Sequence, residues 1–139
     1  MTRRSETSAA PTTVLVADDD EDMRALVATT LREDGYLVRE ACDGAELLTQ
    51  LEEALDDPSA RPDVVVSDVM MPGLSGLGVL NALRRAQQDV PVILITVLSD
   101  ETIHIVARRL GAVGVLHKPF DIDDLRTAIV HACRAFSPK

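Results

Sequence analysis

Aromatic residues are almost missing from this sequence: there are two Phe, one Tyr and no Trp among 139 residues. A hydrophobic core must therefore come from the aliphatic side chains behind the 46% hydrophobic content. Basic residues are also few, since 14 of them face 23 acidic residues and leave a formal charge of -9. Such a chain lacks both the stacking aromatics and the basic stripe of nucleic-acid-binding proteins, so we expect no direct contact with nucleic acid.

Cysteine is scarce as well. Cys42 and Cys133 lie far apart and form no CxxC pair, so the sequence predicts neither a disulfide framework nor a zinc site. We expect both thiols to be small core residues. Metal-ligand spacing is also missing from the three histidines, His104, His117 and His131.

Long apolar runs are absent too. None approaches the ~20 residues that a membrane-spanning helix needs. The apolar run that follows Arg3 and Arg4, residues 14–17, is too short for a signal peptide. We therefore expect a cytoplasmic protein with no membrane association.

Two hydrophobic periods alternate along the chain. Short apolar runs typical of strands buried on both faces occupy residues 14–17, 36–41, 63–67, 92–95 and 113–116. Apolar residues at helical spacing follow each run, within residues 23–34, 43–55, 75–86, 100–110 and 121–136. Their buried faces are expected to include Leu26, Leu55, Ile103, Val106, Leu110 and Phe136. Asp43 and Glu46 resemble a capping box, and residues 56–62 a polar loop.

Five strands alternating with five helices predict one α/β domain, a doubly wound parallel sheet with helices on both faces. We assign residues 13–136 to this domain. Residues 1–12 are expected to form a flexible N-terminal tail and residues 137–139 a C-terminal tail.

Polar side chains stand where these strands end. The first strand is followed by Asp18, Asp19 and Asp20, the third by Asp68, and the fourth ends at Thr96. Lys118, one of only two lysines, follows the fifth. In open parallel sheets, ligands bind beyond the carboxyl ends of the strands, so these side chains are expected to converge.

The grouping favours a divalent cation and a phosphoryl group. Clustered carboxylates need a counter-ion, and hard oxygen ligands with room for water suit Mg²⁺. The Lys118 ammonium is a compact charge that suits a phosphoryl oxygen, and the Thr96 hydroxyl can donate to the same oxygen. Acids in the first loop argue against dinucleotide binding, which uses glycines and backbone amides.

Four motifs in order resemble the receiver domain of bacterial two-component response regulators, of the chemotaxis-regulator type. They are VLVADD at residues 14–19, VVVSDVMMPG at 64–73, LIT at 94–96 and KPF at 118–120. The resemblance implies a flavodoxin-like strand order, 2-1-3-4-5. It also implies a signalling module that is switched by phosphorylation and is no enzyme beyond its own phosphotransfer and dephosphorylation.

The resemblance also assigns roles to the metal ligands. Asp19 would bind Mg²⁺ directly and Asp18 through water, with Asp68 and the backbone carbonyl of Met70 completing the protein ligands. Asp68 would be the phosphoacceptor.

Two further residues would bind the phosphoryl group, Thr96 through its hydroxyl and Lys118 through its ammonium. The Lys118–Pro119 peptide bond would be cis.

The partners implied are a sensor histidine kinase or phosphotransfer protein, and a downstream protein. The downstream protein would dock on the face formed by the helix at 100–110, the strand at 113–116 and the helix from 121. Charged residues expected on this face are Arg108, Arg109, Asp123 and Arg126. We expect a monomer or weak dimer, and we expect no output domain after the last helix.

Two residues depart from the family pattern. Val115 stands where an aromatic switch residue is common, and Val97 stands where Ala or Gly is frequent.

Two other functions remain as alternatives to the signalling module. The two departures leave open a degenerate receiver that acts as a constitutive docking surface. A Mg²⁺-dependent phosphatase of the haloacid-dehalogenase type would use Asp18 and Asp20, but it leaves Asp68 unexplained.

Overall fold

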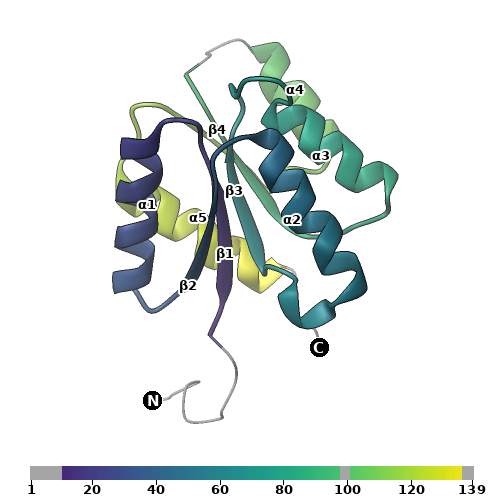
Figure 1. Ribbon diagram of the computed structural model, residues 1–139. Coiled ribbons are helices and arrows are strands. Elements are labelled where there is room, and N and C mark those ends of the chain that lie inside the picture. The colour runs from purple at the N-terminus through teal and green to yellow at the C-terminus, as the bar shows by residue number, and fades with distance from the viewer. Residues whose placement is uncertain (1–10, 98–100, 136–139) are drawn as a thin grey trace.

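The computed structural model describes residues 11–97 and 101–135 and shows one parallel sheet of five strands in the order β2-β1-β3-β4-β5. The strands are β1 (Thr13–Ala17), β2 (Leu37–Ala41), β3 (Val64–Asp68), β4 (Val92–Thr96) and β5 (Gly114–His117). The helices are α1 (Glu21–Glu33), α2 (Gly44–Asp56), α3 (Gly76–Arg85), α4 (Glu101–Arg109) and α5 (Ile122–Ala135). Figure 1 shows helices on both faces, so the predicted doubly wound fold is confirmed.

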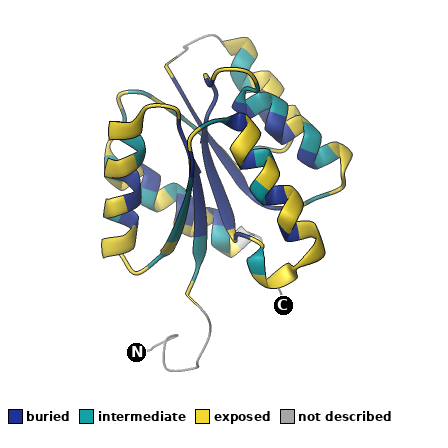
Figure 2. Cartoon of the chain, viewed as in Figure 1, coloured by how far each residue is buried: buried dark blue, intermediate teal, exposed yellow. Residues whose placement is uncertain are grey.

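The sheet separates two aliphatic cores. Successive residues of β1 point to opposite faces, so Val14 enters one core and Leu15 the other. Helices α2, α3 and α4 cover the Leu15 side, and α1 and α5 cover the Val14 side (Figure 1). All residues of β3 and β4 are buried, as is β1 from Val14 onward (Figure 2), which agrees with the apolar runs. The edge strands β2 and β5 are largely half-buried.

Helix starts follow the expected capping chemistry. The Asp20 side chain accepts hydrogen bonds from the backbone amides of Asp22 and Met23 at the start of α1. At the start of α2, Asp43 accepts from the Glu46 amide at 2.8 Å, while the Glu46 carboxylate accepts from the Cys42 amide at 2.6 Å. The capping box predicted from Asp43 and Glu46 is therefore present, with its return bond one residue earlier than usual.

Three residues expected on buried helix faces are exposed. Val106 is 38% exposed because α4 packs on the sheet through its neighbour Ala107, while Ile103 and Leu110 are half-buried. Leu26 is 59% exposed and Leu55 45% exposed, each at the margin of its helix's apolar stripe.

The cysteine prediction was also wrong for one thiol. Cys42 is exposed, because it follows the last residue of the edge strand β2, and Cys133 is half-buried. The polar loop after α2 contains a short 3-10 helix, η2 (Pro58–Ala60). The expected burial of Phe136 lies outside the described residues, as do most of the two predicted tails. Among the described residues, no helix combines the length and apolar character needed to cross a bilayer.

Candidate functional site

The carboxylates after β1 and β3 meet at one edge of the sheet. These strands pair in parallel with Ala17 opposite Ser67, so the next residues, Asp18 and Asp68, are neighbours. Both are buried, at 4% and 5% exposure, whereas Asp19 is exposed. Ligand oxygens of Asp18, Asp19 and Asp68 all lie within 4.8 Å of one another. The structure thus brings together the three acids that sequence reasoning placed at this edge.

Lys118 joins this group from the other side. Its Nζ lies 2.7 Å from Asp68 Oδ2 and 3.4 Å from Asp18 Oδ2. The backbone amide of Lys118 donates to the Thr96 carbonyl at 2.8 Å, which ties the end of β5 to the end of β4. The Lys118–Pro119 peptide bond is cis, as the resemblance implies. Thr96 ends β4, which pairs with β3 beside Asp68, and it is fully buried.

Backbone amides fix the orientation of the two buried carboxylates. The Asp20 amide donates to Asp18 Oδ1 at 2.9 Å, and the Met70 amide donates to Asp68 Oδ1 at 3.0 Å. Each carboxylate therefore has one oxygen held by the backbone and the other directed at the Lys118 ammonium. The side chain of Met70 is 54% exposed, and that of Val97 61%.

The electrostatics of the site favour an additional cation. Burial raises the pKa of Asp18 above its ordinary value, and the charge of Asp68 raises it further, against the opposing effects of the Asp20 amide and of Lys118. Burial lowers the pKa of Lys118, but its bond with Asp68 and the charges of Asp68 and Asp18 outweigh that effect and raise it. One ammonium thus contacts two buried acids, and Asp19 adds a third carboxylate to the group. A donor set made only of carboxylate oxygens fits Mg²⁺ better than a nitrogen- or sulfur-preferring metal.

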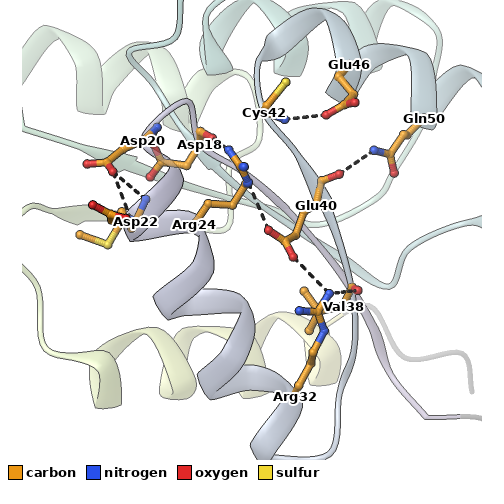
Figure 3. A network of polar contacts seen from close by, with 11 residues as sticks. Asp18, Asp20, Asp22, Arg24, Arg32, Val38, Glu40, Cys42, Glu46 and Gln50 are labelled. Atoms are coloured by element: carbon orange, nitrogen blue, oxygen red, sulfur yellow. Dashed lines mark hydrogen bonds and ion pairs between the residues drawn. The ribbon is translucent and has the colours of Figure 1, made fainter.

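Sequence reasoning missed Arg24 of α1, which supports the acidic turn (Figure 3). Its Nη1 donates to the Asp18 carbonyl at 2.7 Å, and its Nε lies 3.2 Å from Glu40 Oε1 on β2. Arg32, two turns further along α1, lies 3.2 Å from the other oxygen of Glu40. The signal was available: two arginines eight residues apart share a helix face and match an acid on the neighbouring strand.

Asp20, by contrast, stays outside the carboxylate group. Its side chain is engaged at the N-terminus of α1, where it accepts from two backbone amides. A phosphatase that used Asp18 and Asp20 together would need this carboxylate in the site. The geometry therefore favours Asp68 over Asp20 as the functional partner of Asp18.

Asp18→Asn is expected to raise the free energy of unfolding of the Mg²⁺-free protein by about 1 kcal/mol at neutral pH. The folded protein holds the Asp18 proton more tightly than the unfolded chain does, because the folded-state pKa is raised from 3.8. The stability of the wild type therefore falls as pH rises from about 3.8 through that raised pKa, while the variant avoids this loss.

Urea unfolding at several pH values, with a chelator and then with excess Mg²⁺, measures this difference. The advantage of the variant should vanish below the ordinary pKa of Asp18, and Mg²⁺ should stabilise the wild type more than the variant. A variant that is less stable than the wild type at neutral pH without Mg²⁺ would contradict the prediction.

Comparison with known proteins agrees with the geometry. Residues 14–130 match the response regulator receiver domain family. Response regulator MprA of Mycobacterium sp. (strain KMS) is 35% identical over 128 residues, which cover 92% of this chain and 53% of that protein. The chain spans about half the length of the curated relatives it matches.

Solved structures give the same result. The receiver domain of Francisella response regulator 1452 has a TM-score of 0.78 at 33% identity, covering 89% of this chain and 98% of that one. Chemotaxis protein CheY4 of Vibrio cholerae has a TM-score of 0.78 at 32% identity, covering 88% and 99%. With the sheet order, the acidic edge and these matches in agreement, the chain belongs to the receiver domain family of two-component response regulators.

Proposed function

We propose that this chain is a phosphorylation-switched signalling module that accepts a phosphoryl group on Asp68 in a Mg²⁺-dependent reaction. One observation carries the proposal. Lys118 Nζ lies 2.7 Å from Asp68 Oδ2, and Asp68 belongs to the group of three carboxylates that also includes Asp18 and Asp19. An ammonium and a divalent-cation site around one carboxylate neutralise the charge that a phosphoryl group brings.

The donor is a phosphohistidine of a sensor kinase or phosphotransfer protein. An Asp68 carboxylate oxygen attacks phosphorus, the phosphorus–nitrogen bond breaks, and the leaving imidazole keeps the bonding electrons and takes up a proton. The product is an aspartyl phosphate. When held by Asp18, Asp19, Asp68 and the Met70 carbonyl, Mg²⁺ supplies charge neutralisation at the phosphoryl oxygens.

Lys118 and Thr96 act on the product side of this reaction. The acyl phosphate places roughly −2 charge where a single carboxylate stood. The Lys118 ammonium already contacts Asp68, and it would shift to a phosphoryl oxygen, while the Thr96 hydroxyl would donate to another. Thr96 ends β4 and Lys118 directly follows β5, and these strands lead into α4 and α5. The shift therefore changes the balance of conformations of that region.

The face formed by α4, β5 and α5 is the surface proposed to receive a downstream protein. It carries partly exposed apolar side chains, namely Ile105, Val106, Val113 and Val130. Arg108 and Arg109 are exposed there, but Arg126 lies 2.8 Å from Asp34 at the end of α1 and is committed to that ion pair. Val115 is half-buried, so the readout proposed here does not use a rotating aromatic ring.

In this proposal the chain has no turnover substrate and catalyses only its own phosphotransfer and dephosphorylation. It works in the cytoplasm, as a monomer or weak dimer, and it binds no nucleic acid or membrane directly. The acidic net charge of -9 supports the exclusion of nucleic acid.

Incubation with acetyl phosphate and Mg²⁺ tests the proposal. The wild type is expected to gain one acid-labile phosphate, seen as a mass increase, and Asp68→Asn is expected to gain none. Asp20→Asn is the matched control, because asparagine also caps a helix and Asp20 lies outside the cluster. Phosphate incorporation in Asp68→Asn would refute the assignment. Hydrolysis of acetyl phosphate that is lost in Asp20→Asn would favour a phosphatase. If the wild type incorporated no phosphate, a constitutive docking surface would be favoured.

A further inference from the structure

Two histidines, one on α4 and one on β5, are in contact. His104 lies on α4 and His117 is the last residue of β5, and their Nε2 atoms are 3.1 Å apart. The ring centroids are 4.7 Å apart and the ring planes tilt by 35°. His117 is exposed and His104 half-buried, so solvent reaches the pair. Spacing in the sequence, 13 residues, gave no sign of this contact.

We propose that His104 and His117 bind one divalent transition-metal ion of the zinc class, which bridges α4 and β5. Two nitrogens each ~2.05 Å from one ion and 3.1 Å apart subtend roughly 100° at it, close to tetrahedral geometry. Both Nε2 atoms act as ligands when each neutral ring carries its proton on Nδ1.

The third ligand that we propose lies on the same helix. Glu101 precedes His104 by three residues, and the two line one pocket together with Ile105 and Arg108. A Glu-x-x-His spacing places both side chains on one helix face, and this arrangement binds metals in helical bundles. Glu101 is exposed, so its carboxylate can rotate toward the ion, and water completes the coordination. The positive charge of Arg108 in this pocket disfavours binding of a cation, whereas the net charge of -9 on the whole chain favours it.

This second site differs in chemistry from the carboxylate group. Imidazole nitrogens suit Zn²⁺ and its neighbours, whereas Mg²⁺ prefers the oxygens of Asp18, Asp19 and Asp68. The two sites therefore discriminate between the two classes of ion. An ion held by His104 and His117 would fasten α4 to β5 directly before Lys118.

Zinc titration of the tag-free, full-length chain at neutral pH, with millimolar Mg²⁺ to fill the carboxylate group, tests the site. Calorimetry or competition with a chromogenic chelator is expected to show one Zn²⁺ per chain. His104→Ala, His104→Gln and His117→Ala should each weaken binding at least tenfold. His131→Ala, which removes an exposed histidine of α5, should leave the affinity within twofold of the wild type.

Three results would overturn the proposal: no stoichiometric Zn²⁺ binding by the wild type, binding unchanged in the His104 and His117 variants, or binding abolished by Cys42→Ser. The last variant is included because the exposed Cys42 thiol lies near Asp43 and Glu46 and offers zinc an alternative site. Circular dichroism of each variant shows whether the fold is retained, and both histidines lie where substitution removes little buried surface.

Discussion

Replacing Gly76 by alanine is expected to lower the free energy of unfolding by about 2–3 kcal/mol and to slow phosphorylation of Asp68 at least tenfold. Gly76 begins α3, and a Cβ at this position would overlap the backbone carbonyl oxygen of Asp68 and lie 3.1 Å from Ser67 Oγ. The Gly76 amide also donates to the Val69 carbonyl at 3.0 Å. The helix start is therefore pressed against the end of β3, and relief of the clash displaces the strand end that carries Asp68.

Gly78→Ala in the same helix is the matched control. A Cβ there would meet the Cδ1 of Leu74 at 2.7 Å, the far end of a flexible side chain that can move away. Alanine also gains up to about 1 kcal/mol of helix propensity over glycine. We expect this variant to stay within about 1 kcal/mol of the wild type, with normal phosphorylation.

Urea unfolding gives the stability of both variants, and the rate of acetyl-phosphate-dependent modification reports on Asp68. If Gly76→Ala and Gly78→Ala proved equally stable and equally reactive, the close approach of α3 to β3 would not constrain the site.

Lys118→Met is expected to destabilise the Mg²⁺-free protein by about 2–3 kcal/mol, because it leaves buried Asp18 and Asp68 without the ammonium that contacts both. Mg²⁺ should restore a large part of this loss, since it neutralises the same carboxylates. Phosphorylation is expected to slow on the order of 100-fold even with Mg²⁺. The variant lacks the ammonium that is already positioned to stabilise the negative charge that develops on the phosphoryl group.

The pH dependence of the wild type gives an independent check on Lys118. Its folded-state pKa lies above the ordinary value of 10.5, so the ammonium stabilises the fold fully below that pH. The contribution is lost only as pH rises through the raised pKa. Between neutral pH and the raised pKa of Lys118, the free energy of unfolding of Lys118→Met should therefore fall less than that of the wild type.

Lys118→Arg separates charge from geometry. Arginine keeps the positive charge, so the Mg²⁺-free stability should fall less than in Lys118→Met. Its rigid planar fork replaces a compact ammonium, so phosphorylation should still slow. Equal stability of Lys118→Met and the wild type in the presence of a chelator would show that the ammonium does not offset the buried carboxylates.

Local patterns in the sequence were enough to predict the fold. Val14 to Ala17, Val64 to Val66 and Val92 to Ile95 form continuous apolar runs, which mark strands covered on both faces, and helical spacing follows each. Parallel strands place their carboxyl ends at one edge, so the acids after β1 and β3 and the lysine after β5 had to lie close together. The meeting of these three side chains follows from the parallel topology of the sheet, and the alternating strand and helix periods in the sequence predict that topology.

Only tertiary packing decided the remaining features. Ala107 rather than Val106 faces the sheet, because the rotation of α4 depends on the surface it packs against and not on its own pattern. Arg24 reaches the Asp18 carbonyl, and His104 reaches His117, across elements far apart in the chain. A hydrophobic period reports which face of an element is buried, but it carries no information about which polar side chains meet across neighbouring elements, since that depends on how the elements are placed in space.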